Sequence, residues 1–130
     1  MDKSTTKMKS IVPILFVRDV PTSAAYFRDK LGFAIDFLYG EPPFYGAVSR
    51  DGVCIHFRCV HEPNFADLAA REHSLILAAI EVDDVHSLHA ELQRRGADIV
   101  QLPTKQSWGG TDLYVRDPDG NVISFVTFGL

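Results

Sequence analysis

The sequence predicts an α+β domain made of two tandem βαβββ modules, whose strands form a curved mixed sheet with a concave cleft and whose helices lie on the outer face. Two observations support this fold class. Apolar strands, one amphipathic helix and a closing hairpin occur twice along the chain in the same order. Short segments of the two halves also match at a nearly constant spacing.

The first module is predicted at about residues 11–60. An apolar, β-branched strand at 11–17 precedes Asp19-Val20-Pro21-Thr22, which favours a helix with proline in its first turn. Gly32 is placed to end this helix in a left-handed cap. Three strands are then expected at 33–39, 44–50 and 53–60, with Asp51-Gly52 in the last hairpin turn.

The second module is predicted at about 75–130, after a linker at 61–74. It begins with a strand at 75–82, followed by a helix that Asp84 caps and Gly96 ends. Its other strands are expected at 97–102, 111–116 and 121–128. Residues 11–130 would then form a single domain, and the polar residues 1–10 a disordered tail.

The two halves align as a duplicated unit. Val17–Val20 matches Val82–Val85 at an offset of 65, and Asp51–Phe57 matches Asp119–Phe125 at an offset of 68. A shift of three residues over half a chain is a change in loop length. The alternative is that two unrelated units share the same helix-start and hairpin chemistry.

Composition limits the function classes. The 130 residues carry a net charge of −4, which argues against nucleic acid as the main partner. No apolar run is long enough to span a membrane. Cys54 and Cys59 fall on opposite faces of one predicted strand and cannot pair with each other. Free thiols and an N-terminus without the pattern of a signal peptide lead us to expect a cytoplasmic location.

Several segments resemble one known superfamily. Val12–Asp19 with Ala25-Tyr26-Phe27 and Leu31-Gly32-Phe33 looks like the start of a vicinal oxygen chelate protein, of the glyoxalase, bleomycin resistance and extradiol dioxygenase superfamily. Glu81–Val85 looks like the start of its second module. Trp108-Gly109-Gly110 followed by Arg116–Asn121 is similar to the ending of its bleomycin-resistance branch. The resemblance covers about residues 11–128.

The enzymes of this superfamily generally hold a divalent metal with one ligand from each of four strands. The positions that match here are Val12, His56, Leu77 and Ser124. Only His56 is a competent ligand, whereas catalytic metal sites need about three protein ligands. The comparison with the superfamily therefore predicts no metal and no cofactor.

The resemblance then implies a metal-independent binding protein that sequesters an antibiotic or an aromatic metabolite. Relatives of this type suggest a homodimer, with or without exchanged strands. One alternative is a glyoxalase-like lyase or isomerase, or a dioxygenase, whose atypical metal site uses His61, His73 or Glu81. Another is a metal-free enzyme with His56 as general acid or base.

Strand parity proposes which side chains would contact the ligand. His56 and Arg58 share one face of their strand, and Asp112, Tyr114 and Arg116 share one face of another, whose first-module counterparts are expected at Phe44, Gly46 and Val48. Trp108 is the best single contact, because its ring can stack on planar ligands; the alternative is that it packs as core at the sheet edge. The predicted ligand site comprises Trp108, His56, Arg58, Tyr39, Phe44, Tyr45, Asp112, Tyr114 and Ser124.

Overall fold

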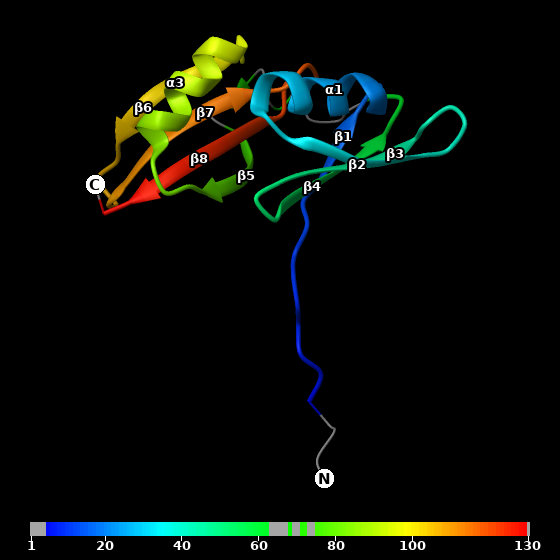
Figure 1. Cartoon of the computed structure of the whole chain (residues 1–130), viewed down its shortest axis with the longest axis horizontal. Helices are drawn as coiled ribbons and strands as arrows, with labels where there is room; N and C mark the ends of the chain where they lie inside the picture. Colours follow the sequence, from blue (N-terminus) through cyan, green and yellow to red (C-terminus); the bar gives the residue numbers. More distant parts are fainter. Residues whose placement is uncertain (1–4, 63–67, 69–70, 73–74, 130) are drawn as a thin grey trace.

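The computed structural model describes residues 5–62, 68, 71–72 and 75–129 (Figure 1). The first module contains β1 (Ile14–Val17), α1 (Val20–Leu31), β2 (Ala34–Tyr39), β3 (Tyr45–Arg50) and β4 (Val53–Cys59). The second contains β5 (Ile76–Glu81), α3 (Val85–Arg95), β6 (Ile99–Lys105), β7 (Gly110–Arg116) and β8 (Val122–Phe128). No helix among the described residues is long and apolar enough to cross a membrane.

Each module forms its own four-stranded mixed sheet. The strand orders are β1-β4-β3-β2 and β5-β8-β7-β6, so the same topology occurs twice. The first strand of each module runs parallel to the last, and the remaining pairs are antiparallel. The two sheets lie side by side with α1 and α3 on one side (Figure 1). The predicted α+β fold of two tandem βαβββ modules is confirmed.

The strand predicted at 11–17 starts three residues later, at Ile14. Pro13 precedes it and has no N–H to donate to a strand neighbour. The preceding residues 5–13 extend away from the body as an arm (Figure 1), on which Ile11 is 92% exposed. Most of the linker predicted at 61–74, and residues 1–4 of the predicted tail, lie outside the described residues.

The helix boundaries follow from their caps. Asp84 accepts hydrogen bonds from the backbone N–H groups of His86 and Ser87, which satisfies the first turn of α3. Gly32 and Gly96 adopt the left-handed conformation that ends each helix, with φ of 77° and 76°. Asp51 and Gly52 also have positive φ, as a two-residue hairpin turn requires.

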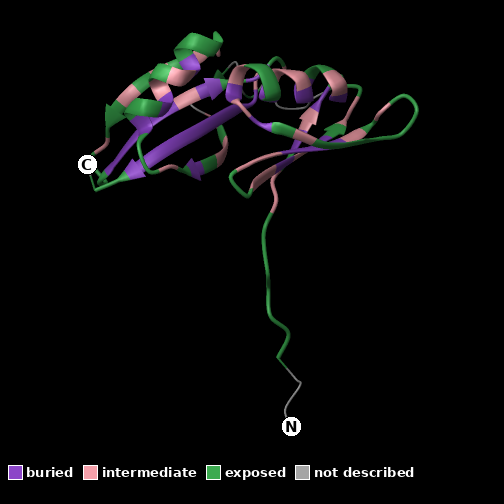
Figure 2. Ribbon diagram, in the orientation of Figure 1, coloured by how far each residue is buried: buried purple, intermediate pink, exposed green. Residues whose placement is uncertain are grey.

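A single apolar core runs through both modules beneath the helices. Phe27 of α1 is fully buried, and its ring meets Phe33 and Phe57 edge-on at centroid distances of 5.4 and 5.1 Å. Ile55 and Ile123 occupy the equivalent inward positions on β4 and β8. Figure 2 shows β8 buried along most of its length.

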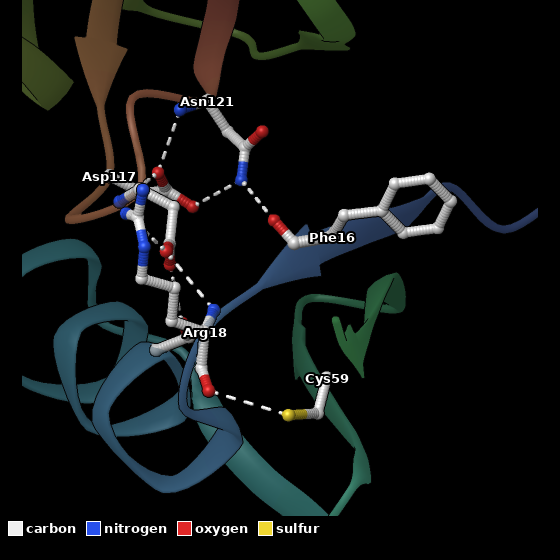
Figure 3. A network of polar contacts seen from close by, with 7 residues as sticks. Phe16, Arg18, Cys59, Asp117 and Asn121 are labelled. Atoms are coloured by element: carbon white, nitrogen blue, oxygen red, sulfur yellow. Dashed lines mark hydrogen bonds and ion pairs between the residues drawn. The ribbon is translucent and has the colours of Figure 1, made fainter. Parts of the chain in front are cut away.

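The β7–β8 turn, residues 117–121, connects the second module to the first (Figure 3). Asp119 accepts a hydrogen bond from the backbone N–H of Arg18 at 3.1 Å, and its Oδ1 lies 3.4 Å from the Arg18 guanidinium. Asn121 Nδ2 donates to the carbonyl of Phe16 in β1 at 3.2 Å. The turn therefore holds the end of β1 and the start of α1.

Asp117 holds this turn in shape from inside. Its carboxylate accepts hydrogen bonds from the backbone N–H of Asp119 and from both the backbone and the side-chain amide of Asn121, at 2.8–2.9 Å. Burial raises the pKa of Asp117 to about 6, although these hydrogen bonds oppose the shift. The Asp117 carboxylate is thus mostly charged at pH 7, although its burial disfavours the charged form.

Helix residues complete the contact between modules. The Tyr26 hydroxyl of α1 donates to the carbonyl of Arg116 at 2.8 Å and accepts from the backbone N–H of Asp98 at 3.1 Å. The position equivalent to Tyr26 in the second module, 65 residues later, is Glu91 of α3. The Glu91 carboxylate accepts two hydrogen bonds from Arg50, at 3.0 and 2.8 Å. Each helix therefore contacts the β-hairpin of the other module.

The raised pKa of Asp117 makes a pH-dependent contribution to stability. Because its folded pKa of about 6 exceeds the unfolded value of 3.8, the folded state holds the proton more tightly, and stability falls as pH rises from about 4 to about 6. Replacing Asp117→Asn removes this component. We expect the free energy of unfolding of the wild type to fall by about 2 kcal/mol relative to D117N between pH 4 and pH 7.

Urea unfolding followed by circular dichroism at several pH values measures this difference. Because D117N also loses a hydrogen-bond acceptor, its absolute stability does not test the assignment. The test is the pH dependence of its free energy of unfolding. Wild-type and D117N stabilities that run parallel across this pH range would contradict the assignment.

Candidate ligand-binding site

The side of the first sheet opposite α1 is rich in aromatic side chains. We call it the aromatic face, and its members come from all four strands: Ile14, Phe37, Tyr39, Tyr45, His56 and Arg58. The strand register places them together, because Tyr45 pairs with Arg58 and with Tyr39, and Ile14 pairs with His56. The predicted residues Tyr39, Tyr45, His56 and Arg58 thus share one surface.

Three rings form the centre of the aromatic face. The Tyr45 hydroxyl and His56 Nδ1 are hydrogen-bonded at 2.9 Å. Phe37 stacks on Tyr45 at a centroid distance of 6.4 Å and meets His56 edge-on at 5.8 Å. Phe37 is 44% exposed, so its ring offers a flat apolar surface beside a polar imidazole. The sequence reasoning missed Phe37, although alternation from the predicted Tyr39, two residues later in β2, places it on the same face.

Phe44 lies at the edge of the aromatic face. It precedes β3, is half exposed, and meets Tyr39 edge-on at 5.4 Å. The other two residues expected on the face with it, Gly46 and Val48, point the opposite way. Val48 is fully buried in the core, and a Cβ on Gly46 would lie 2.8 Å from Val20 of α1.

Turn length explains this error. The pair Arg116–Val122 encloses five residues in the second module, whereas the equivalent pair Ser49–Cys54 encloses four in the first. One residue moves every side chain of a strand to the other face. The true counterparts of Asp112, Tyr114 and Arg116 are therefore Tyr45, Ala47 and Ser49.

The open face of the second sheet carries the remaining predicted residues. Trp108 lies over Gly110, where an added Cβ would overlap the far edge of the indole, and its ring is 5.9 Å from that of Phe128. It is 58% exposed, so it lies on the surface of this face and not in the core. Gly110 is thus the close-approach position that lets the indole lie flat on β7.

Asp112 and Ser124 lie beneath this surface, at 2% and 4% exposure. The Asp112 carboxylate accepts hydrogen bonds from the side-chain amides of Gln101 at 2.8 Å and Gln106 at 2.9 Å. Burial raises the pKa of the neighbouring Tyr114, and the Asp112 charge adds to the shift. Asp112 of β7 therefore holds the side chain of Gln101 in the neighbouring strand β6. No sequence signal had singled out Gln101 or Gln106.

The residues at the superfamily's metal positions do not fit a metal. His56 pairs across the sheet with Ile14, and Ser124 with Ala79, each two residues after the matched positions Val12 and Leu77. Ile14 and Ala79 supply no lone pair either. Among the described residues, no three His, Cys, Asp or Glu side chains gather where they could hold an ion; His73, an alternative ligand, lies outside them.

Cys54 shares a face of β4 with His56 but is a poor nucleophile. Burial raises the pKa of its thiol, and the charge of Asp36 adds to this, so the reactive thiolate is disfavoured at neutral pH. Cys54 and Cys59 are both free, as expected.

Two βαβββ modules, each with a helix on one side and an open sheet face on the other, define a protein of the vicinal oxygen chelate type. The chain belongs to the Glyoxalase/Bleomycin resistance protein/Dioxygenase superfamily, whose family model matches residues 7–125.

The chain is also similar to solved structures and to one curated protein. The chain is 27% identical to the bleomycin-binding protein of bleomycin-producing Streptomyces verticillus complexed with copper(II)-bleomycin, with a TM-score of 0.76 over 97% of this chain and 100% of that one. It shares the fold of a bleomycin resistance determinant encoded on transposon Tn5, at 23% identity and a TM-score of 0.74 over 95% and 100% of the two chains. It is also 25% identical to the uncharacterized protein YraH of Bacillus subtilis (strain 168), over 89% of this chain and 95% of YraH.

The close contact of Trp108 with Gly110 is testable by Gly110→Ala. The added methyl group overlaps the indole, so the ring must leave β7 and Phe128. We expect higher acrylamide quenching of the single tryptophan and a loss of about 1 kcal/mol in the free energy of unfolding. Ser49→Ala, on the other sheet, serves as control. Unchanged quenching in G110A would show that the indole does not rest on Gly110.

Proposed function

We propose that this chain is a metal-independent binding protein that sequesters an antibiotic or another aromatic metabolite. The observation that carries the proposal is the set of exposed rings on the open sheet faces, above all Phe37 and Trp108. Of the strand positions that would hold a metal in the superfamily, His56 alone carries a competent ligand. Such a protein protects by stoichiometric binding and needs no turnover.

The chemistry of the faces suits a planar, partly polar ligand. Phe37, Tyr45 and Trp108 supply flat apolar area, while His56 and Arg58 supply polar edges. The relative from Streptomyces verticillus is a bleomycin-binding protein, which favours the same class of ligand here.

The proposal includes a homodimer whose second copy covers the open faces. Ile14, Phe37, Trp108 and Phe128 are large apolar side chains, each at least 44% exposed, and they lie on faces that the chain itself does not cover. Apolar surface gathered in this way is typical of an interface. The arm at residues 5–13 points away from its own body (Figure 1), and we propose that it packs on the partner, as in a strand-exchanged dimer.

Ligand binding is tested with copper(II)-bleomycin in a calorimetric titration. We expect saturation at no more than one ligand per chain, and about tenfold weaker binding by Trp108→Ala, because stacking on the indole is lost. His56→Ala should weaken binding less. Leu38→Ala, which removes an exposed apolar side chain from the helix side of β2, should bind as the wild type does.

Elemental analysis of the purified protein provides the matching test of metal independence. One tightly held divalent ion per chain, together with metal-dependent turnover of a small substrate, would contradict the proposal and favour a superfamily enzyme.

The dimer is tested by sedimentation at low micromolar concentration. We expect a species of twice the 14.5 kDa chain mass. Met8→Ser/Ile11→Ser should weaken the dimer, because both apolar side chains of the arm lose their burial on the partner. Lys7→Ser/Lys9→Ser, on the same arm, is the control. A wild type that sediments only at 14.5 kDa would exclude the dimer.

A further inference from the structure

A cavity of about 480 Å³ lies between the two modules, away from both open faces. It is bounded by the β3–β4 turn of the first module and by the end of β5 and the start of α3 in the second. Its apolar residues belong to the buried side of the sheets: Phe33, Val53, Ile80, Leu88 and Phe125. A volume of this size is in the range of small-molecule sites.

Comparison of the two modules explains why this space is open. In the equivalent place of the other module, the longer β7–β8 turn brings Asp119 against Arg18 and Ser23 and fills the gap. The β3–β4 turn has only Asp51 and Gly52, and a Cβ added to Gly52 would meet nothing within 4 Å. The cavity therefore lies at the position where, on the other side of the module boundary, the Asp119 turn fills the equivalent space.

The charge of the cavity lining is strongly one-sided. Its charged residues are one guanidinium, Arg50, and five carboxylates: Asp51, Glu81, Asp83, Asp84 and Glu91. Arg50 is already neutralised, because Glu91 accepts two hydrogen bonds from it and an oxygen of Asp51 lies 3.7 Å from its Nε. Asp84 is likewise occupied, since it caps the positive end of α3.

Two carboxylates remain available to a ligand. Glu81 and Asp83 are exposed at the cavity, and their side-chain carboxylates form no hydrogen bond or ion pair within the described part of the chain. Asp83 stands where the first module has Arg18, which pairs with Asp119. The sign of the charge is thus inverted between the filled contact and the open one.

We propose that this cavity is a second binding site, which takes a small organic cation with an apolar body. The apolar part of a primary amine or guanidine would pack against Ile80, Leu88 and Phe125, and its charged end would lie at Asp83 and Glu81. An anion would meet five carboxylates, and a neutral apolar molecule would gain no attraction from the two free ones. The site uses no residue of the open faces and is independent of their function.

The test uses 4-phenylbutylammonium as probe and the neutral 4-phenylbutanol as its matched partner, titrated into the full chain labelled with nitrogen-15. We expect saturable shifts of the backbone amides of Val53, Val82 and Ser87. The alcohol should bind at least about tenfold more weakly, since it lacks the charge that the carboxylates attract.

Glu81→Gln/Asp83→Asn should weaken binding of the ammonium probe by about tenfold and leave the alcohol unaffected. Glu62→Gln/Glu72→Gln removes the same charge from exposed residues that do not line the cavity and should bind as the wild type does. Equal affinity for ammonium and alcohol, unchanged binding by the E81Q/D83N protein, or shifts confined to Phe37, His56 and Trp108 would each overturn the proposal.

Discussion

The placement of the two modules depends on a charged carboxylate, that of Asp117, buried inside a turn. Three N–H donors surround it, and hydrogen bonds to a charged group contribute about 1.5–3 kcal/mol each. They fix the turn so that Asp119 and Asn121 reach β1 and α1 of the other module. If the turn lost this shape, the modules would still share the apolar core and the helix contacts, but β1 and α1 would lose their hydrogen bonds to Asp119 and Asn121.

The repeated topology gives the chain two equivalent contacts between modules, and the residues that form them differ. One is closed by a long turn and by a neutral hydroxyl, that of Tyr26. The other relies on the Arg50–Glu91 ion pair, because its shorter turn does not reach across. Within a single fold, one contact is thus filled by the Asp119 turn while the other leaves a cavity open.

Sequence reasoning succeeded where local chemistry determines the structure. Asp84, Gly32 and Gly96 marked the helix ends correctly, because capping depends on neighbouring backbone groups alone. It failed where the outcome depends on counting residues across a turn: one additional residue moved Tyr45 onto the open face and Gly46 and Val48 off it. The buried contacts of Asp112 with Gln101 and Gln106, and the cavity between the modules, join segments whose proximity no periodicity reveals.

The position of Trp108 has a practical consequence for handling the protein. Its ring contacts Phe128, and Phe128 is followed immediately by the exposed Gly129. A peptide fused after Leu130, such as a purification tag or a fluorescent fusion, would follow Phe128 by only two residues and would begin near the indole. A tag in contact with the ring changes its fluorescence and its exposure, so assays that read this residue require a cleavable attachment.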